Sequence, residues 1–77
     1  MTRAELYATL DDILEIPIGT LTGNEALETL DGWDSVAVVN FIATVHGLFN
    51  VILSAQRVKD CKSVPELAAL VTSHLTD

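Results

Sequence analysis

The chain has 77 residues, which is room for one domain and no second core. Hydrophobic residues make up 49% of it, enough for a packed core, and this composition excludes intrinsic disorder. The net charge of −7 argues against nucleic-acid binding, because a phosphate backbone would repel the chain.

Other features narrow the class of protein further. No apolar run approaches the roughly 20 residues that a membrane-spanning helix needs. The first five residues lack the basic and apolar regions of a secretory signal. The single Cys61 cannot form an internal disulfide, and no Cys/His cluster has metal-ligand spacing. We therefore expect a monomeric cytoplasmic protein without a metal site or membrane association.

The charge is distributed unevenly about Ser35. The residues before it include one base, Arg3, and eight acids: Glu5, Asp11, Asp12, Glu15, Glu25, Glu28, Asp31 and Asp34. From Ser35 onward, three acids and three bases cancel. All the net charge therefore lies upstream of the serine, where it favours attraction to basic protein partners.

The first predicted helix begins at Thr2-Arg3-Ala4-Glu5, a capping-box pattern. It continues as an apolar stripe at helical spacing, made of Leu6, Leu10, Ile13 and Leu14. Pro17 disfavours helix at Ile16, so we expect this helix to end about there.

Residues 17–34 are predicted to form a long first loop because they are rich in turn formers: Pro17, Gly19, Gly23, Asn24 and Gly32. We expect Leu21, Leu27 and Leu30 to hold this loop against the core. A loop of this length in a compact domain is uncommon and is often functional.

The second helix is predicted to begin at Asp34-Ser35, since both residue types cap free backbone N–H groups. It runs to about Phe49 with one inward stripe: Val38, Phe41, Ile42, Val45 and Phe49. A strand is excluded because strict apolar/polar alternation is absent and the segment is too long.

A short third helix is predicted from Ser54 to about Asp60. The last helix begins at Ser63-Val64-Pro65-Glu66, a second capping box with proline in the first turn. Its inward stripe comprises Val64, Leu67, Ala68, Val71 and Leu75. The sequence therefore predicts an all-α domain over residues 1–77, a four-helix bundle of three long helices and one short one.

Ser35 is the strongest candidate for chemistry. At a helix N-terminus its hydroxyl lies beside free backbone N–H groups and the positive end of the helix dipole. A phosphate ester would be well accommodated there. On position alone, however, the simpler interpretation is that Ser35 only caps the helix.

A resemblance favours the phosphate ester. Gly32-Trp33-Asp34-Ser35-Val36 resembles the Gly-x-Asp-Ser-Leu signature of acyl carrier proteins, whose serine receives 4′-phosphopantetheine from coenzyme A. Leu53-Ser54 is similar to the Ile-Pro that opens the family's third helix, and Ser63-Val64 to the Thr-Val that opens its last. The second helix is similar in its apolar residues: Val38, Val39, Phe41, Val45 and Phe49. The resemblance covers essentially the whole chain.

The resemblance implies that Ser35 carries the arm and that Asp34 contacts the phosphopantetheinyl transferase. Asp34 could instead serve only as a cap. Val36 and Val39 lie off the inward stripe on one helix face, and the resemblance implies that they dock partner enzymes. The alternative is that the first loop covers them. Trp33 could shield the arm's phosphate or pack the loop, and packing is favoured.

The second helix departs from the family in its charge. The family usually has several glutamates there, whereas this chain has Asn40, His46, Gly47 and Leu48 in the corresponding region. Val36 also replaces the signature leucine. These departures favour dedicated partners whose binding depends little on salt.

The expected function is an acyl carrier of fatty acid, polyketide or related biosynthesis, which is not itself an enzyme. Its partners would be a magnesium-dependent phosphopantetheinyl transferase, a loading ligase or acyltransferase, and downstream enzymes. Acid before the serine favours acyl cargo, because peptidyl carriers more often have histidine or glycine there. An aminoacyl, peptidyl or D-alanyl carrier remains an alternative, and the length favours a discrete carrier over an excised module.

Two other classes of protein share features with this sequence. Asp34, Ser35 and His46 include the residue types of a hydrolase triad. However, the serine and the histidine would lie roughly 16 Å apart along one helix, whereas a nucleophile and its base need about 3 Å. The remaining class is an acidic helical adaptor with an unmodified serine, which predicts that Ser35→Ala leaves function intact.

Overall fold

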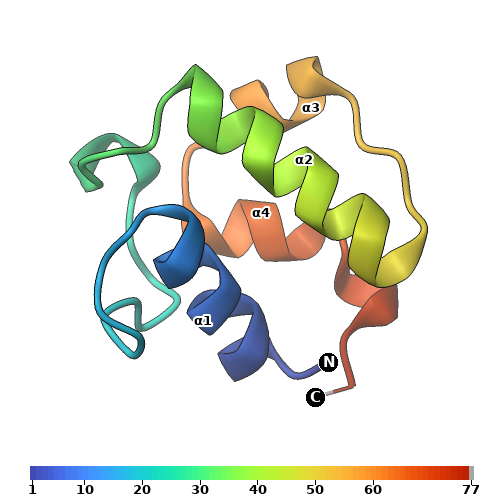
Figure 1. The fold of residues 1–77 in the computed structure, drawn as a ribbon, viewed down its shortest axis with the longest axis horizontal. Coiled ribbons are helices and arrows are strands. Elements are labelled where there is room, and N and C mark those ends of the chain that lie inside the picture. The colour runs from blue at the N-terminus through green and yellow to red at the C-terminus, as the bar shows by residue number, and fades with distance from the viewer. Residues whose placement is uncertain (77) are drawn as a thin grey trace.

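The computed structural model describes residues 1–76. That part of the chain forms four α-helices and two 3-10 turns, Leu27–Thr29 and Thr72–His74 (Figure 1). The helices are α1 (Arg3–Ile13), α2 (Ser35–Phe49), α3 (Ala55–Asp60) and α4 (Val64–Ala69). No β-strand occurs in residues 1–76, so the all-α prediction is confirmed.

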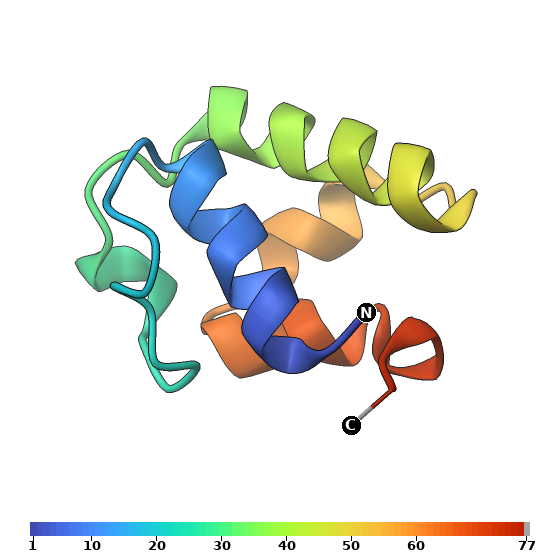
Figure 2. The ribbon, with the colours of Figure 1, turned by 60° about the horizontal axis from the view of Figure 1, so that its bottom comes forward.

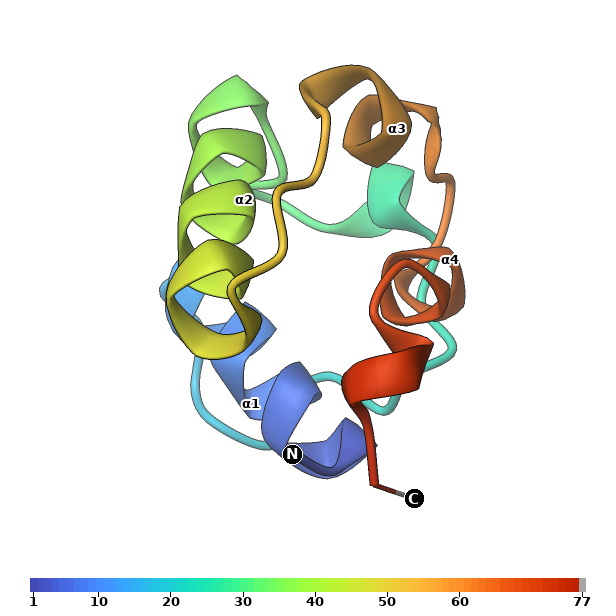
Figure 3. The ribbon, with the colours of Figure 1, turned by 90° about the vertical axis from the view of Figure 1, so that its right-hand side faces the viewer.

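The helices surround one core. The longest helix, α2, contacts both α1 and α3, and Figure 2 shows α1 running away from it at a steep angle. In Figure 3, α2 and α4 lie on opposite sides of the core. The first and last described residues meet, since the Thr76 N–H donates to the Met1 carbonyl at 2.8 Å.

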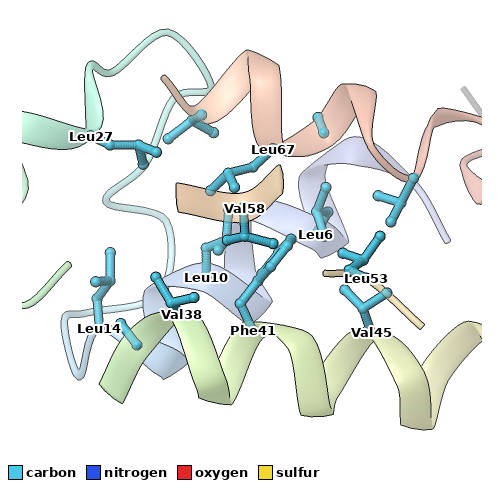
Figure 4. Packing of buried hydrophobic residues seen from close by; sticks show 14 of the residues in the cluster. Leu6, Leu10, Leu14, Leu27, Val38, Phe41, Val45, Leu53, Val58 and Leu67 are labelled. Carbon is cyan, nitrogen blue, oxygen red and sulfur yellow. The ribbon is translucent and has the colours of Figure 1, made fainter. Parts of the chain in front are cut away.

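The core between the helices is mainly aliphatic (Figure 4). Phe41 of α2 lies at its centre and is 1% exposed, and Val58 of α3 and Leu67 of α4 close over it with no exposed surface. Leu6, Leu10 and Leu14 contribute the buried face of the first helical segment. The inward stripes predicted for the helices are therefore buried or half-buried.

The first helix begins as predicted but ends earlier. The Thr2 hydroxyl accepts from the Glu5 N–H, and the Glu5 carboxylate accepts from the Thr2 N–H, which completes the capping box. The helix ends at Ile13 rather than Ile16. Two N–H groups beyond the end of the helix donate back to it as in a Schellman motif. The Glu15 N–H donates to the Asp12 carbonyl, and the Ile16 N–H donates to the Asp11 carbonyl. Glu15 takes the left-handed position with φ of 58°.

The last helix is shorter than predicted. α4 has six residues, and the N–H groups of Leu70 and Val71 then donate to carbonyls three residues back. The Thr72 hydroxyl donates to the Ala68 carbonyl at 3.1 Å, so a side chain competes for the backbone there. β-branched and hydroxyl residues from Val71 onward also favour helix weakly. The described residues therefore form two long helices and two short ones.

Candidate functional site

Ser35 is the first residue of α2, and its side chain is exposed. The cap of the helix is Asp34, whose backbone is extended and whose carboxylate accepts from the Ala37 N–H at 3.0 Å. Within residues 1–76 the Ser35 hydroxyl forms no hydrogen bond that would hold it at the backbone. The capping role therefore belongs to Asp34, which leaves the neighbouring hydroxyl available for chemistry.

The surroundings of Ser35 suit a phosphate ester. The N–H groups of Ser35 and Val36 open the helix and have no acceptor within residues 1–76. α2 has 15 residues, and the positive end of its dipole lies at this N-terminus, beside Ser35. A phosphate esterified to this hydroxyl would thus lie beside free donors and open solvent, so the residues present fit a phosphopantetheine group.

Trp33 packs the loop that leads into the site. Its ring is half-buried and meets Phe41 edge-on, with ring centroids 6.2 Å apart and planes at 71°. Gly32 before it has φ of 90°, a conformation that favours glycine. The favoured interpretation of Trp33, packing against the core, agrees with this geometry.

Asp11 of α1 anchors the first loop. This role was not predicted from the sequence. This carboxylate is fully buried and accepts from the Gly19 N–H at 2.8 Å and the Leu21 N–H at 3.1 Å. Its sequence signal was its position on the inward face between Leu10 and Leu14, just before a glycine-containing loop. A buried carboxylate is stable only when it accepts hydrogen bonds, so its two backbone partners fix the position of the loop in a way that non-directional apolar contacts do not.

Glu25 closes a turn farther along the loop. Its carboxylate accepts from the N–H groups of Thr22, Gly23 and Asn24 and from the Thr22 hydroxyl. Hydrogen bonds from the Thr22 backbone are the largest cause that lowers the pKa of Glu25 from 4.5 to about 2, while burial opposes the shift.

The loop is also tied to the start of α4. The Leu27 N–H donates to the Lys62 carbonyl and the Val64 N–H donates to the Glu25 carbonyl, both at 2.9 Å. Leu21 and Leu27 are buried and Leu30 is half-buried, as the sequence analysis expected. The segment that presents Asp34 and Ser35 is therefore fixed at several points.

Val36 and Val39 face outward from α2. They are 65% and 62% exposed, so the first loop does not cover them and that alternative is wrong. α2 has no acidic residue, and His46 is its one titratable group. Two carboxylates from other segments, those of Glu15 and Asp34, line a hollow of about 280 Å³ beside Val36.

The triad geometry is absent. Ser35 and His46 lie on one uninterrupted helix, which keeps them roughly 16 Å apart along its axis. His74 stacks on Phe49 with ring centroids 5.1 Å apart. The Cys61 thiol is half-buried and donates to the Arg57 carbonyl, and burial followed by the charges of Glu66 and Asp60 raises its pKa.

Residues 1–76 offer neither a cluster of metal ligands nor a membrane-spanning helix. They contain no group of three or more His, Cys, Asp or Glu side chains that could hold a metal ion. They also contain no helix with the length and apolar content needed to cross a membrane.

Comparison with known proteins agrees with this geometry. The family described as "Phosphopantetheine attachment site" matches residues 4–71. Nonribosomal peptide synthetase 32 of Fusarium pseudograminearum (strain CS3096) is 28% identical over 67 residues, which are 87% of this chain and 1% of that protein. No solved structure matches significantly.

Carrier domains of this family hold a covalent 4′-phosphopantetheine and work with phosphopantetheinyl transferases and synthetase enzymes. They are non-catalytic carriers. Since the family match spans most of the chain, including the Asp34-Ser35 turn, this protein belongs to the phosphopantetheine-attachment family and is a phosphopantetheine carrier domain.

Proposed function

We propose that Ser35 is the attachment residue and that the chain presents thioester-bound intermediates to partner enzymes. The observation that carries this proposal is the exposed Ser35 hydroxyl at the first position of α2, left free because Asp34 takes the cap. The thiol of the arm supplies the thioester chemistry, while the protein positions the arm and is recognised by the partner enzymes.

The modification step needs an accessible hydroxyl and a docking surface for the transferase. In that step the Ser35 oxygen forms a new bond to the phosphorus of the phosphopantetheine. The bond from that phosphorus to the bridging oxygen of the coenzyme A diphosphate breaks, and the nucleotide bisphosphate leaves with the electron pair on that oxygen. The hydroxyl proton leaves to a base of the transferase or to water. Asp34 and Glu15, which line the hollow beside Val36, are suited to attract a basic or magnesium-bearing surface.

Partner docking would be largely apolar on α2. Val36 and Val39 are exposed, and the helix that carries them has no acidic residue. Apolar contacts depend little on ionic strength, whereas contacts between exposed charges are screened. We therefore expect downstream partners to lose little affinity in high salt, in contrast with the transferase if it uses the carboxylates.

Two cargo classes have separate support. Asp34-Ser35-Val36 favours an acyl group, as in fatty acid or polyketide synthesis. The similarity to a nonribosomal peptide synthetase supports an aminoacyl or peptidyl group instead. Loading the phosphopantetheine form with malonyl or fatty acyl groups, in parallel with amino acids and an adenylating enzyme, distinguishes these classes by the mass of the product.

Intact-protein mass spectrometry tests the attachment. The chain is incubated with coenzyme A, magnesium and a promiscuous phosphopantetheinyl transferase, beside Ser35→Ala and the control Ser73→Ala, which removes another exposed serine hydroxyl. We expect one phosphopantetheine on the wild type and on Ser73→Ala, and none on Ser35→Ala.

Folding of the variants is checked by circular dichroism. Ser35→Ala should fold normally, because the Ser35 hydroxyl does not cap α2. Addition to folded Ser35→Ala would refute Ser35 as the attachment residue. No addition to folded wild type with several transferases would favour the unmodified adaptor.

A further inference from the structure

Trp33 comes two residues before Ser35, in the segment that joins the Leu27–Thr29 turn to α2. Its N–H donates to the Leu30 carbonyl at 3.3 Å. Within residues 1–76, no other N–H group of residues 31–36 has an acceptor. The path of this segment into α2 therefore depends on side chains more than on backbone hydrogen bonds.

The Trp33 ring ties this segment to α2. The ring meets Phe41 edge-on, with ring centroids 6.2 Å apart. Phe41 follows Ser35 by six residues, about 9 Å along the helix axis, and it is 1% exposed at the centre of the core (Figure 4). Trp33 is the one hydrophobic side chain of residues 31–36 that packs against this core. The ring therefore fixes the segment to a residue that cannot move without disturbing the core.

Two neighbouring residues compete to cap α2, because aspartate and serine are both strong caps. In the structure Asp34 takes this role, and its carboxylate accepts from the Ala37 N–H at 3.0 Å. If the helix began one residue later, Ser35 would be the cap and its hydroxyl oxygen would accept from the Val38 N–H. That oxygen would then face the helix backbone, and one of its lone pairs would no longer be free to attack phosphorus.

We propose that Trp33 is a positioning residue for the modification of Ser35, a role that rests on the proposed attachment there. Its contact with Phe41 holds the preceding turn in the register in which Asp34 is the cap, so the Ser35 hydroxyl stays exposed. The ring acts through this turn and not by contact with the reacting atoms. Without the ring the two registers compete, and the apparent affinity for the transferase falls with the fraction of molecules that present a free hydroxyl.

Steady-state kinetics of the modification test this role. The full chain is the varied substrate of a promiscuous phosphopantetheinyl transferase with saturating coenzyme A and magnesium, and intact-protein mass measures the product. Trp33→Ala should raise KM for the chain about three- to tenfold and leave kcat nearly unchanged, since the transferase binds the register with a free hydroxyl. Trp33→Phe, which keeps a ring beside Phe41, should restore most of this loss. If Trp33→Phe has the KM of Trp33→Ala, the ring contact is not the cause.

Tyr7→Ala is the matched control. Tyr7 is also a half-buried aromatic residue packed against the core. Its ring lies against Gly23, where an added Cβ would be 2.6 Å from the Tyr7 Cε2. The substitution thus removes aromatic packing at a different part of the first loop, and KM should match that of the wild type. Circular dichroism verifies that each variant is folded, and Trp33→Leu replaces Trp33→Ala if the latter is not.

Hydrogen exchange of single amides gives a readout that a general loss of stability would not. The Ala37 N–H at the start of α2 is held by the Asp34 carboxylate and is freed when the cap moves to Ser35. Its exchange should speed up about three- to tenfold in Trp33→Ala and stay unchanged in Tyr7→Ala. The buried Val45 in the same helix reports global unfolding, so its exchange should follow the overall stability of each variant.

The outcomes separate the two proposals. No addition to the folded wild type overturns both the attachment at Ser35 and the role of Trp33. Addition at Ser35 with equal KM for Trp33→Ala and the wild type overturns the positioning role alone, as does an equal rise of KM in Tyr7→Ala. A fall in kcat at unchanged KM would mean that the ring acts on the reacting groups directly, which also overturns it.

Discussion

The first loop and the outer face of α2 differ in their charge and in their exposed apolar side chains. Upstream of Ser35 the chain is acidic, but two of its carboxylates hold the first loop by hydrogen bonds: Asp11 is fully buried, and Glu25 accepts four hydrogen bonds. The outer face of α2 has no acid and presents Val36 and Val39. Net charge therefore overstates the charge offered to a partner, because part of it maintains the loop that holds Ser35.

Removing Asp11 should have the largest effect on this comparison. In Asp11→Ala the Leu21 N–H loses its acceptor in a buried region and the Gly19 N–H loses its acceptor in a part-buried one, at a cost of about 1–3 kcal/mol for each unpaired group that water does not reach. We expect the free energy of unfolding to fall by about 2–4 kcal/mol, measured by urea denaturation.

The control for this change is Asp12→Ala, which removes the neighbouring exposed acid of α1. It should alter stability by less than about 0.5 kcal/mol. If the two variants unfold at similar urea concentrations, the buried carboxylate is not the anchor of the loop.

A double substitution on α2 should weaken partner recognition while leaving the fold intact. Val36→Ser with Val39→Ser removes two exposed apolar side chains, each of which could bury enough surface on docking to contribute about 1 kcal/mol. We expect kcat/KM with the phosphopantetheinyl transferase or a loading enzyme to fall roughly tenfold or more, with urea stability nearly unchanged.

Ile18→Ser serves as the control, since Ile18 lies on the first loop and is equally exposed. The same assays at low and high salt separate the two surfaces: loss caused by the valine substitutions should persist in high salt. Equal kinetics for the double variant and the wild type would remove the docking role of this face.

The local signals in the sequence predicted where helices begin more reliably than where they end. Thr2 and Ser63 are caps as expected, because a cap depends on residues within one turn. The end of α1 depends on Glu15, which adopts a left-handed conformation that sequence patterns assign to glycine. The end of α4 at Ala69 had no glycine or proline to mark it.

The site shows the same division between local and long-range information. The Asp34-Ser35 helix start and the exposure of Val36 and Val39 follow from sequence spacing. The role of Asp11 does not, because its partners are eight and ten residues away across a loop whose path spacing alone cannot predict.

The pH dependence of stability should show the smallest effect, and it concerns Glu25. Its folded-state pKa of about 2 lies below the ordinary 4.5, so its ionised form is favoured by folding. The stabilisation is therefore complete above about pH 4.5 and is lost as the pH falls toward 2. Because the carboxylate is partly exposed, solvent screening limits the effect to about 1 kcal/mol or less.

Glu25→Gln isolates that contribution from the other acids. Its amide cannot become a carboxylate, so the difference in urea stability between the wild type and Glu25→Gln should be greatest near pH 6 and shrink as the pH falls through 4 and 3. Glu28→Gln, on the exposed side of the same loop, should show no such change. If the wild type stays more stable than Glu25→Gln by the same amount down to pH 3, the turn needs the shape of the Glu25 side chain and not its charge. Ionisation would then contribute less to the stability of the acidic loop than its hydrogen bonds indicate.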